Sequence, residues 1–269
     1  PRHSGDGSRN RHEAILLSNS PKTIVILGAT SAVAQAYARL RAEQGPVQFI
    51  LVGRNTQNLA IIRDDLIARG ANTSVDIAGD LGVPDNVPAL FDLVKAKADR
   101  VDEVVLAYGI LGDQDSLQKD MTAVRTLLDV DFVSAAMWAE AFADLFVTQG
   151  SGHLVIIGSV AGDRGRQSNY LYGAAKAGLE RMAEGMAHRF AGSAAIHVTL
   201  VKPGFIDTPM TDHIPGKGGP LWATPDKIAQ VMARAVDKKR VRVYAPWFWR
   251  GILLIVRSLP VPIMHKTRM

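Results

Sequence analysis

The chain has 269 residues, of which 47% are hydrophobic and 21% charged, a balance typical of a globular protein with a sizeable core. It contains no cysteine, which excludes disulfide frameworks, cysteine-ligated metals and thiol nucleophiles, and no metal site is predicted. The net charge of +5 is uneven, because residues 1–22 carry +2 and residues 238–269 carry +8, leaving −5 on the rest. An acidic body argues against nucleic acid as a partner.

Residues 1–21 are rich in Arg, Ser, Asn and Gly and are interpreted as a flexible tail or a cloning remnant. They include no long apolar stretch of the signal-peptide type. No segment of the chain reaches the ~20 uninterrupted apolar residues that a membrane-spanning helix requires. The sequence therefore predicts a cytoplasmic protein.

From residue 22 onward, short apolar runs alternate with stretches long enough for helices. Helical spacing is clear in Leu179, Ala183 and Met186, which recur at three and four residues. This alternation predicts one doubly wound α/β domain of the Rossmann type over residues 22–245, with a mostly parallel seven-stranded sheet and helices on both faces. The predicted strands are Thr23–Leu27, Phe49–Val52, Ser74–Ile77, Val101–Ala107, His153–Ile157, His197–Val201 and Val241–Tyr244.

The first predicted strand runs into a turn of small residues, Leu27 to Ala34, and then into a helix. Free backbone N–H groups and the helix dipole at such a turn suit the pyrophosphate of a dinucleotide. The turn contains a single glycine, so a purely structural turn is the alternative. The residues predicted to hold the cofactor here are Gly28, Thr30, Ser31, Ala32 and Val33.

The second predicted strand ends in Gly53, Arg54 and Asn55. An NAD enzyme usually places an acid at this point to hold the ribose 2′-hydroxyl, whereas the planar cation of an arginine suits a 2′-phosphate. The sequence therefore favours NADP(H) over NAD(H), with Arg54 and Asn55 as contacts. The alternative is that Arg54 is only a solvated loop charge.

A third motif joins Ser159, after the fifth predicted strand, to Tyr172 and Lys176, which open a helix thirteen residues later. Tyr and Lys four residues apart share a helix face, so Lys176 is expected to favour the ionised phenol. A tyrosine tuned in this way can exchange a proton with a substrate oxygen near neutral pH. Taken singly, each residue has a purely structural interpretation: Ser159 as a loop hydroxyl, Tyr172 as a half-buried ring and Lys176 as a solvated charge. Together, and with the segment Pro203–Thr208 after the next strand, they predict a catalytic site.

With these motifs, residues 22–244 resemble the short-chain dehydrogenase/reductase family. The resemblance implies that Ser159 and Tyr172 hold the carbonyl or hydroxyl oxygen, while Lys176 also binds the nicotinamide ribose. The family's segments after the third, fourth and sixth strands contact the adenine and the nicotinamide. The further cofactor contacts that the resemblance implies are Asp80, Leu81, Ala107, Tyr108, Gly109, Tyr172, Lys176, Pro203, Gly204, Ile206 and Thr208.

The chain departs from the family pattern at several positions. Two glycines of the family's turn are Ala32 and Ala34, whose methyl groups are tolerable if φ stays negative. The asparagine that anchors a proton-relay water in the family is Asp131, counted here among the catalytic residues although it cannot donate as an amide does. These departures leave open a catalytically weak dinucleotide-binding sensor as an alternative. The intact set Ser159, Tyr172 and Lys176 favours an enzyme that transfers hydride between a nicotinamide and a carbonyl or secondary alcohol.

The segment 107–114, the turn over residues 28–31 and the C-terminus are similar to one branch of the family, the decaprenylphosphoryl-2-keto-pentose reductases and their relatives. That likeness implies a keto-sugar on a polyprenyl phosphate as substrate, with a small soluble carbonyl compound or alcohol as the alternative. The family resemblance also implies a homo-oligomer, either a dimer or a tetramer.

Residues 246–269 are predicted to form an amphipathic helix centred on Trp247–Leu259, ~20 Å long and too short to span a bilayer. Two Trp at one end, an aliphatic middle and Arg250 and Arg257 on one face are typical of an interfacial helix. The flanking Lys and Arg residues would attract anionic lipid. A membrane-surface contact would place the protein peripherally on the inner face of the membrane. A lid over the substrate pocket, an oligomer contact and a membrane-surface scaffold without catalysis are the alternatives.

Overall fold

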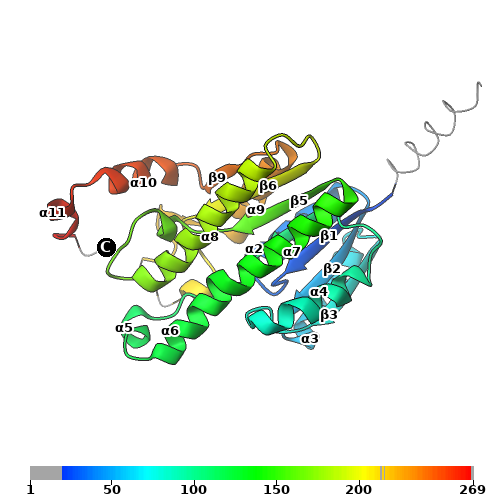
Figure 1. Ribbon diagram of the computed structural model, residues 1–269, viewed down its shortest axis with the longest axis horizontal. Coiled ribbons are helices and arrows are strands. Elements are labelled where there is room, and N and C mark those ends of the chain that lie inside the picture. The colour runs from blue at the N-terminus through cyan, green and yellow to red at the C-terminus, as the bar shows by residue number, and fades with distance from the viewer. Residues whose placement is uncertain (1–19, 213, 215, 268–269) are drawn as a thin grey trace, which may run out of the picture.

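The computed structural model describes residues 20–212, 214 and 216–267, so most of the predicted tail lies outside the described residues. All seven predicted strands form, and they join one parallel sheet in the order β3-β2-β1-β4-β5-β6-β9 (Figure 1). The order reverses between β1 and β4, the switch point at which doubly wound folds bind their ligands. The strands are β1 (Lys22–Leu27), β2 (Val47–Gly53), β3 (Thr73–Ala78), β4 (Glu103–Leu106), β5 (Gly152–Ile157), β6 (Ile196–Pro203) and β9 (Arg242–Ala245).

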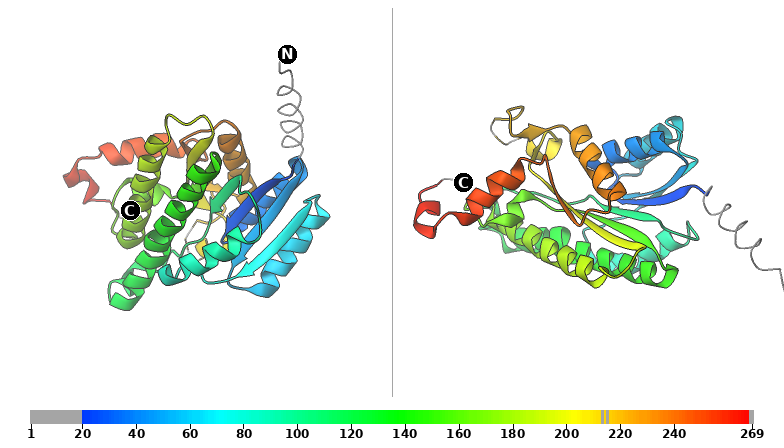
Figure 2. Two further views of the ribbon diagram at one scale, coloured as in Figure 1. Left: turned by 45° about the vertical axis from the view of Figure 1, so that its right-hand side comes forward. Right: turned by 90° about the horizontal axis from the view of Figure 1, so that it is seen from above.

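Helices cover both faces of the sheet (Figure 2), which confirms the doubly wound architecture. Alternate residues of β1 enter opposite cores: Val25 and Leu27 pack on one side, and Ile24 and Ile26 on the other. Strands buried on both faces need continuous apolar runs, and this is why the strands were readable from the sequence. The first core is covered by α4 (Val87–Lys95), α7 (Ser134–Gln149) and α8 (Tyr170–Arg189), and the second by α2 (Ala32–Gln44), α3 (Thr56–Ala68) and α9 (Pro225–Asp237).

Short elements fill the connections that follow the carboxyl ends of the strands. Two of them, β7 (Phe205–Ile206) and β8 (Trp222–Ala223), pair in a small second sheet that was not predicted, since two residues carry no readable periodicity. The others are η1 (Pro84–Asn86), α5 (Gln114–Leu117), α6 (Met121–Leu128), the π-helical turn η2 (Asp129–Val133), η3 (Val160–Asp163) and η4 (Pro209–Thr211).

The predicted C-terminal helix forms as α10 (Trp249–Ser258) and is followed by the single turn α11 (Val261–Met264) at one end of the molecule (Figure 1). Its inner side is buried, with Trp249 and Leu253 packed in a cluster that includes Val160 and Phe205. The Trp249 ring centre lies 5.5 Å from that of Phe205. Among the described residues, no helix is both long enough and apolar enough to cross a membrane.

Candidate active site

A cleft with a volume of about 670 Å³ opens at the carboxyl ends of the strands, on both sides of the switch point between β1 and β4. This volume lies within the range of small-molecule and cofactor sites. Two predicted site residues, Asn55 and Asp131, do not line the cleft. The predicted residues that do line it are Gly28, Thr30, Ser31, Ala32, Val33, Arg54, Asp80, Leu81, Ala107, Tyr108, Gly109, Ser159, Tyr172, Lys176, Pro203, Gly204, Ile206 and Thr208.

The turn between β1 and α2 brings the backbone close to the cleft. Gly28 has φ of +89°, and a Cβ there would lie 2.8 Å from the backbone nitrogen of Tyr108, so only glycine fits. Ala32 and Ala34 lie in α2 with negative φ, because Lys239 alone among the described non-glycine residues has a positive one. Their methyl groups are therefore tolerated, and the amino end of α2 faces the cleft as a pyrophosphate site requires.

The end of β2 presents a cation at the cleft. The Arg54 side chain is 75% exposed, and its Nη1 lies 3.9 Å from Asp80 Oδ2, a loose pair that leaves the guanidinium accessible. Asn55, by contrast, is the N-cap of α3, where its side-chain oxygen accepts a hydrogen bond from the backbone N–H of Asn58 at 2.9 Å. Capping accounts for this asparagine. The two neighbours thus have different roles, which the sequence alone did not separate.

Ser159, Tyr172 and Lys176 converge on the cleft from two elements. The Oγ of Ser159 accepts a hydrogen bond from the Ala161 N–H at 3.0 Å, as the N-cap of η3, so its own O–H is free to donate. Tyr172 and Lys176 lie one turn apart near the start of α8, with Lys176 Nζ 5.5 Å from the centre of the Tyr172 ring. The structure therefore brings the predicted catalytic residues together.

Burial changes the expected ionisation of Tyr172. Burial raises the pKa of Tyr172 above its ordinary value, and it outweighs the opposing effects of Lys176 and the Ser159 hydroxyl. Lys176 does favour the ionised phenol, as the sequence predicted, but burial has the larger effect and the net shift is upward. Burial alone would lower the pKa of Lys176, but Asp131 and Tyr172 hold it above the usual range. At neutral pH the site contains a protonated phenol beside a cationic lysine.

Asp131 lies beneath the cleft in the π-helical turn η2, with its side chain fully buried. Its Oδ1 accepts a hydrogen bond from the Ile110 N–H at 3.0 Å and pairs with Lys176 Nζ at 3.3 Å. Burial raises the pKa of Asp131, while Lys176 and the Ile110 N–H oppose this shift. A Cβ on Gly109 would lie 2.5 Å from Asp131 Oδ1, so the glycine permits this close approach. Asp131 thus holds the predicted catalytic lysine, Lys176, as a hydrogen-bond acceptor, which an aspartate can do without an amide donor.

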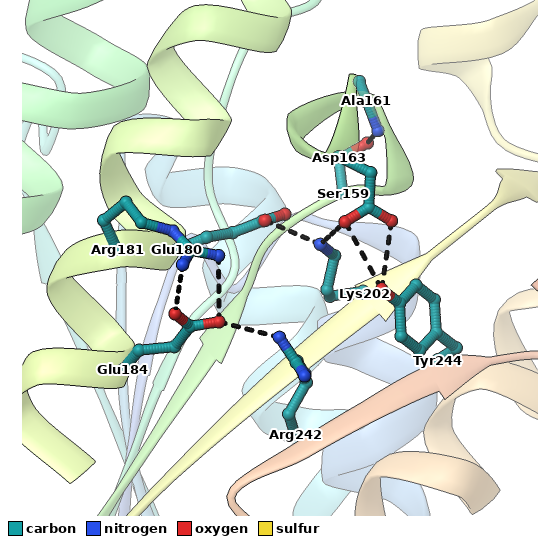
Figure 3. Close-up of polar contacts among 9 residues, drawn as sticks. All are labelled: Ser159, Ala161, Asp163, Glu180, Arg181, Glu184, Lys202, Arg242 and Tyr244. Carbon is teal, nitrogen blue, oxygen red and sulfur yellow. Dashed lines mark hydrogen bonds and ion pairs between the residues drawn. The ribbon is translucent and has the colours of Figure 1, made fainter. Parts of the chain in front are cut away.

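A buried charged cluster behind Ser159 was missed at the level of sequence (Figure 3). Lys202 Nζ lies 2.5 Å from Asp163 Oδ1 and 2.6 Å from Glu180 Oε2, and the Tyr244 hydroxyl donates to Asp163. The cluster joins η3, α8, β6 and β9. It therefore ties the loop that carries Ser159 to the helix that carries Tyr172. The one sequence signal was a lysine at the end of a mostly apolar strand, just before Pro203.

Comparisons with known proteins agree with this geometry. The short chain dehydrogenase family model matches residues 22–217. The chain is 35% identical over 241 residues to an uncharacterized oxidoreductase of Mycobacterium tuberculosis, covering 88% of this chain and 93% of that protein.

Two solved structures share the fold. A short-chain dehydrogenase from Sphingobium yanoikuyae in complex with NADPH has a TM-score of 0.76 at 22% identity, covering 92% of this chain and 97% of its own. A short-chain dehydrogenase/reductase from Burkholderia phymatum in complex with NAD has a TM-score of 0.78 at 19% identity, covering 93% of this chain and 96% of its own. Because the two hold different nicotinamide cofactors, the choice between them must be argued from this chain's own residues.

Proposed function

Because the chain belongs to the short-chain dehydrogenase/reductase family and is a nicotinamide-dependent oxidoreductase acting on CH–OH groups, we propose that it uses NADP(H) and interconverts a keto-sugar carried on a polyprenyl phosphate with the corresponding alcohol. The observation that carries the proposal is the convergence of Ser159, Tyr172 and Lys176 in a cleft whose β2 end presents Arg54. The cleft suits a dinucleotide, since Gly28 and the amino end of α2 form its phosphate side.

In the direction of reduction, the nicotinamide supplies the hydride when it is bound. The substrate carbonyl oxygen lies between the Ser159 hydroxyl, which donates a hydrogen bond, and the protonated Tyr172 phenol, which donates its proton as charge develops on that oxygen. Lys176, held by Asp131, keeps a positive charge beside the phenol and stabilises the phenolate that remains. The raised pKa of Tyr172 keeps the phenol protonated at neutral pH, which is the form that reduction requires.

Replacing Arg54 by Ala is expected to weaken NADPH binding by about tenfold or more, because a charge-assisted hydrogen bond to the 2′-phosphate contributes roughly 1.5–3 kcal/mol. NADH carries no such phosphate, so its affinity should change by less than about twofold. Isothermal titration of both cofactors checks this prediction. Arg39→Ala is the matched control, because Arg39 pairs with Asp65 at 2.6 Å and does not line the cleft. Equal affinities of the wild type for NADPH and NADH would contradict the role of Arg54.

The surface of α10 and α11 supports a lipid-linked substrate at a membrane surface. Leu254 and Ile255 are 66% and 67% exposed, and Trp247 is 82% exposed. Exposed basic side chains flank this apolar surface, and no acidic residue occurs between residues 238 and 269. The inner side of the same helix packs on Phe205, which lines the cleft. A helix with one side on the pocket and the other side apolar and basic suits an enzyme that takes its substrate from an anionic lipid surface.

The double variant Leu254→Glu/Ile255→Glu should lose co-sedimentation with vesicles containing anionic lipid, whereas the wild type should sediment and do so less at high salt. Ile61→Glu on α3 is the matched control, because Ile61 is 68% exposed and lies on another surface. Deleting the whole segment is a poor test, since a Cβ on Gly204 would collide with the Trp249 indole and the helix therefore supports the cleft. A wild type that stays in solution with vesicles at low salt would contradict the membrane contact.

A homo-oligomer is also part of the proposal. The family resemblance supports it, as do Met137 and Val147, which are 38% and 49% exposed on α7. Sedimentation velocity of the purified protein tests it, with a dimer or tetramer expected and a monomer at micromolar concentration contradicting it.

A further inference from the structure

Three polar atoms on the cleft wall have no hydrogen-bond partner among the described residues, although each is buried. They are Gln114 Nε2, Arg166 Nε and Asn169 Oδ1. Two are donors and one is an acceptor. A buried polar group without a partner costs free energy, so such groups on the wall of a cleft indicate a ligand that completes them.

Gln114 is held so that its amide nitrogen stays available. The residue is only 8% exposed, and its Oε1 accepts a hydrogen bond from the Leu171 N–H at 3.1 Å. This bond joins α5 to the first turn of α8, next to Tyr172. The amide is thus fixed on α5, while its nitrogen has no hydrogen-bond partner among the residues that the structure describes.

Arg166 lies in the loop between Ser159 and Tyr172, and it forms no ion pair with any residue that the structure describes. Asp163, the acid closest to it in sequence, already accepts from Lys202 and Tyr244. Burial lowers the pKa of Arg166, with Tyr172 and Asp163 acting in the opposite direction. Among the described residues, Arg166 has no counter-ion within ion-pair distance, and an anion bound in the cleft would supply one.

Arg164, two residues earlier, behaves differently. Its Nη1 donates to the carbonyl oxygen of Arg257 at 2.7 Å, and it does not line the cleft. Arg164 shows that an arginine in this loop can find a hydrogen-bond partner within the protein. Arg166 is available to bind a ligand because it lies on the cleft wall.

We propose that Arg166, together with Gln114 and Asn169, forms a substrate subsite that selects a hydroxyl-bearing ketone with an anionic oxygen group, either phosphate or carboxylate, over neutral ketones. This inference rests on the proposed function, because it assigns a specificity to the same cleft. The subsite serves the substrate and not the cofactor, since its residues come from α5 and the loop before α8. The predicted phosphate and adenine contacts follow β1, β2 and β3 instead.

The test uses the enzyme saturated with NADP⁺, which keeps a phosphate ligand out of the cofactor site and cannot reduce the ketone during the titration. Isothermal titration compares D-ribulose phosphate with D-ribulose, two keto-sugars that differ in the anionic group. The wild type should bind the phosphate at least about tenfold more tightly, the gain of one charge-assisted hydrogen-bond pair. Arg166→Gln should bind ribulose phosphate no more tightly than ribulose, and its affinity for ribulose should stay within about twofold of the wild type.

Arg164→Gln is the matched control and should keep the wild-type ratio, while Arg166→Lys should retain part of it because the charge persists without the planar fork. A carboxylate-bearing keto-sugar acid, titrated in parallel, distinguishes a phosphate site from a general anion site. Equal binding of ribulose and its phosphate to the wild type, or a ratio that Arg166→Gln leaves unchanged, would overturn the subsite. A preserved ratio with no hydride transfer to any ketone would contradict the proposed function instead.

Discussion

Replacing Tyr172 by Phe is expected to lower kcat by about 100-fold or more while leaving the affinity for NADPH within about twofold. Tyr172 lines the cleft and is the proposed proton donor, and its loss removes no predicted contact to the phosphates of the cofactor. Steady-state kinetics and a cofactor titration on the same preparation check both parts of this prediction.

Tyr170→Phe is the matched control, since Tyr170 lies on the same helix, is 44% exposed and has only a 3.4 Å contact with Gln118. It should retain wild-type kcat. A Tyr172→Phe enzyme that keeps more than about a tenth of wild-type kcat would contradict proton donation by this residue.

Replacing Lys202 by Met is expected to destabilise the protein by about 3–5 kcal/mol, because two buried carboxylates then lose their shared counter-ion. Lys202 has no exposed side-chain surface, and Asp163 and Glu180 are 4% and 1% exposed. Denaturant unfolding measures this loss. Arg242→Met is the matched control: Arg242 pairs with Glu184 at 2.8 Å but is 43% exposed, so the cost should stay below about 1 kcal/mol (Figure 3).

The loss of folding stability caused by Lys202→Met should also depend on pH. Burial raises the pKa of Glu180, and Lys202 opposes this shift. The folded protein therefore holds a proton at Glu180 more tightly than the unfolded chain, so stability falls as the pH rises from the ordinary Glu range toward the raised pKa. Without Lys202 the pKa of Glu180 rises further. The stability lost by Lys202→Met should therefore be smaller at about pH 5 than at about pH 8. An equal loss of stability at both pH values would show that the variant loses packing and not a charge interaction.

The fold was readable from the sequence because each strand of a doubly wound sheet is buried on both faces and therefore apolar along its length. The disagreements lie at element ends: β4 covers Glu103–Leu106, where the sequence predicted Val101–Ala107. The C-terminal helix starts at Trp249 and ends before Pro260, which cannot continue it.

The motif proposed to be catalytic could be predicted for a different reason, since Tyr172 and Lys176 are neighbours on one helix turn. The Lys202 cluster could not be read, because Asp163, Glu180 and Lys202 are distant in sequence and meet only after α8 and β6 pack. The net pKa shift of Tyr172 was missed because desolvation is a property of the folded chain. Likewise, only the structure separates Arg166, on the cleft wall, from Arg164, which donates to α10.

The central claim is that this chain transfers hydride between a nicotinamide and a carbonyl carbon with Tyr172 as proton donor. The most direct measurement incubates the enzyme with NADPH deuterated at the transferred position of C4, over a panel of lipid-linked and soluble keto-sugars, steroids and short ketones. The account predicts one deuterium at the new carbinol carbon of at least one product, seen by mass spectrometry and formed about 100-fold or more slowly by Tyr172→Phe. Tight NADPH binding with no deuterated product from any member of the panel would contradict it.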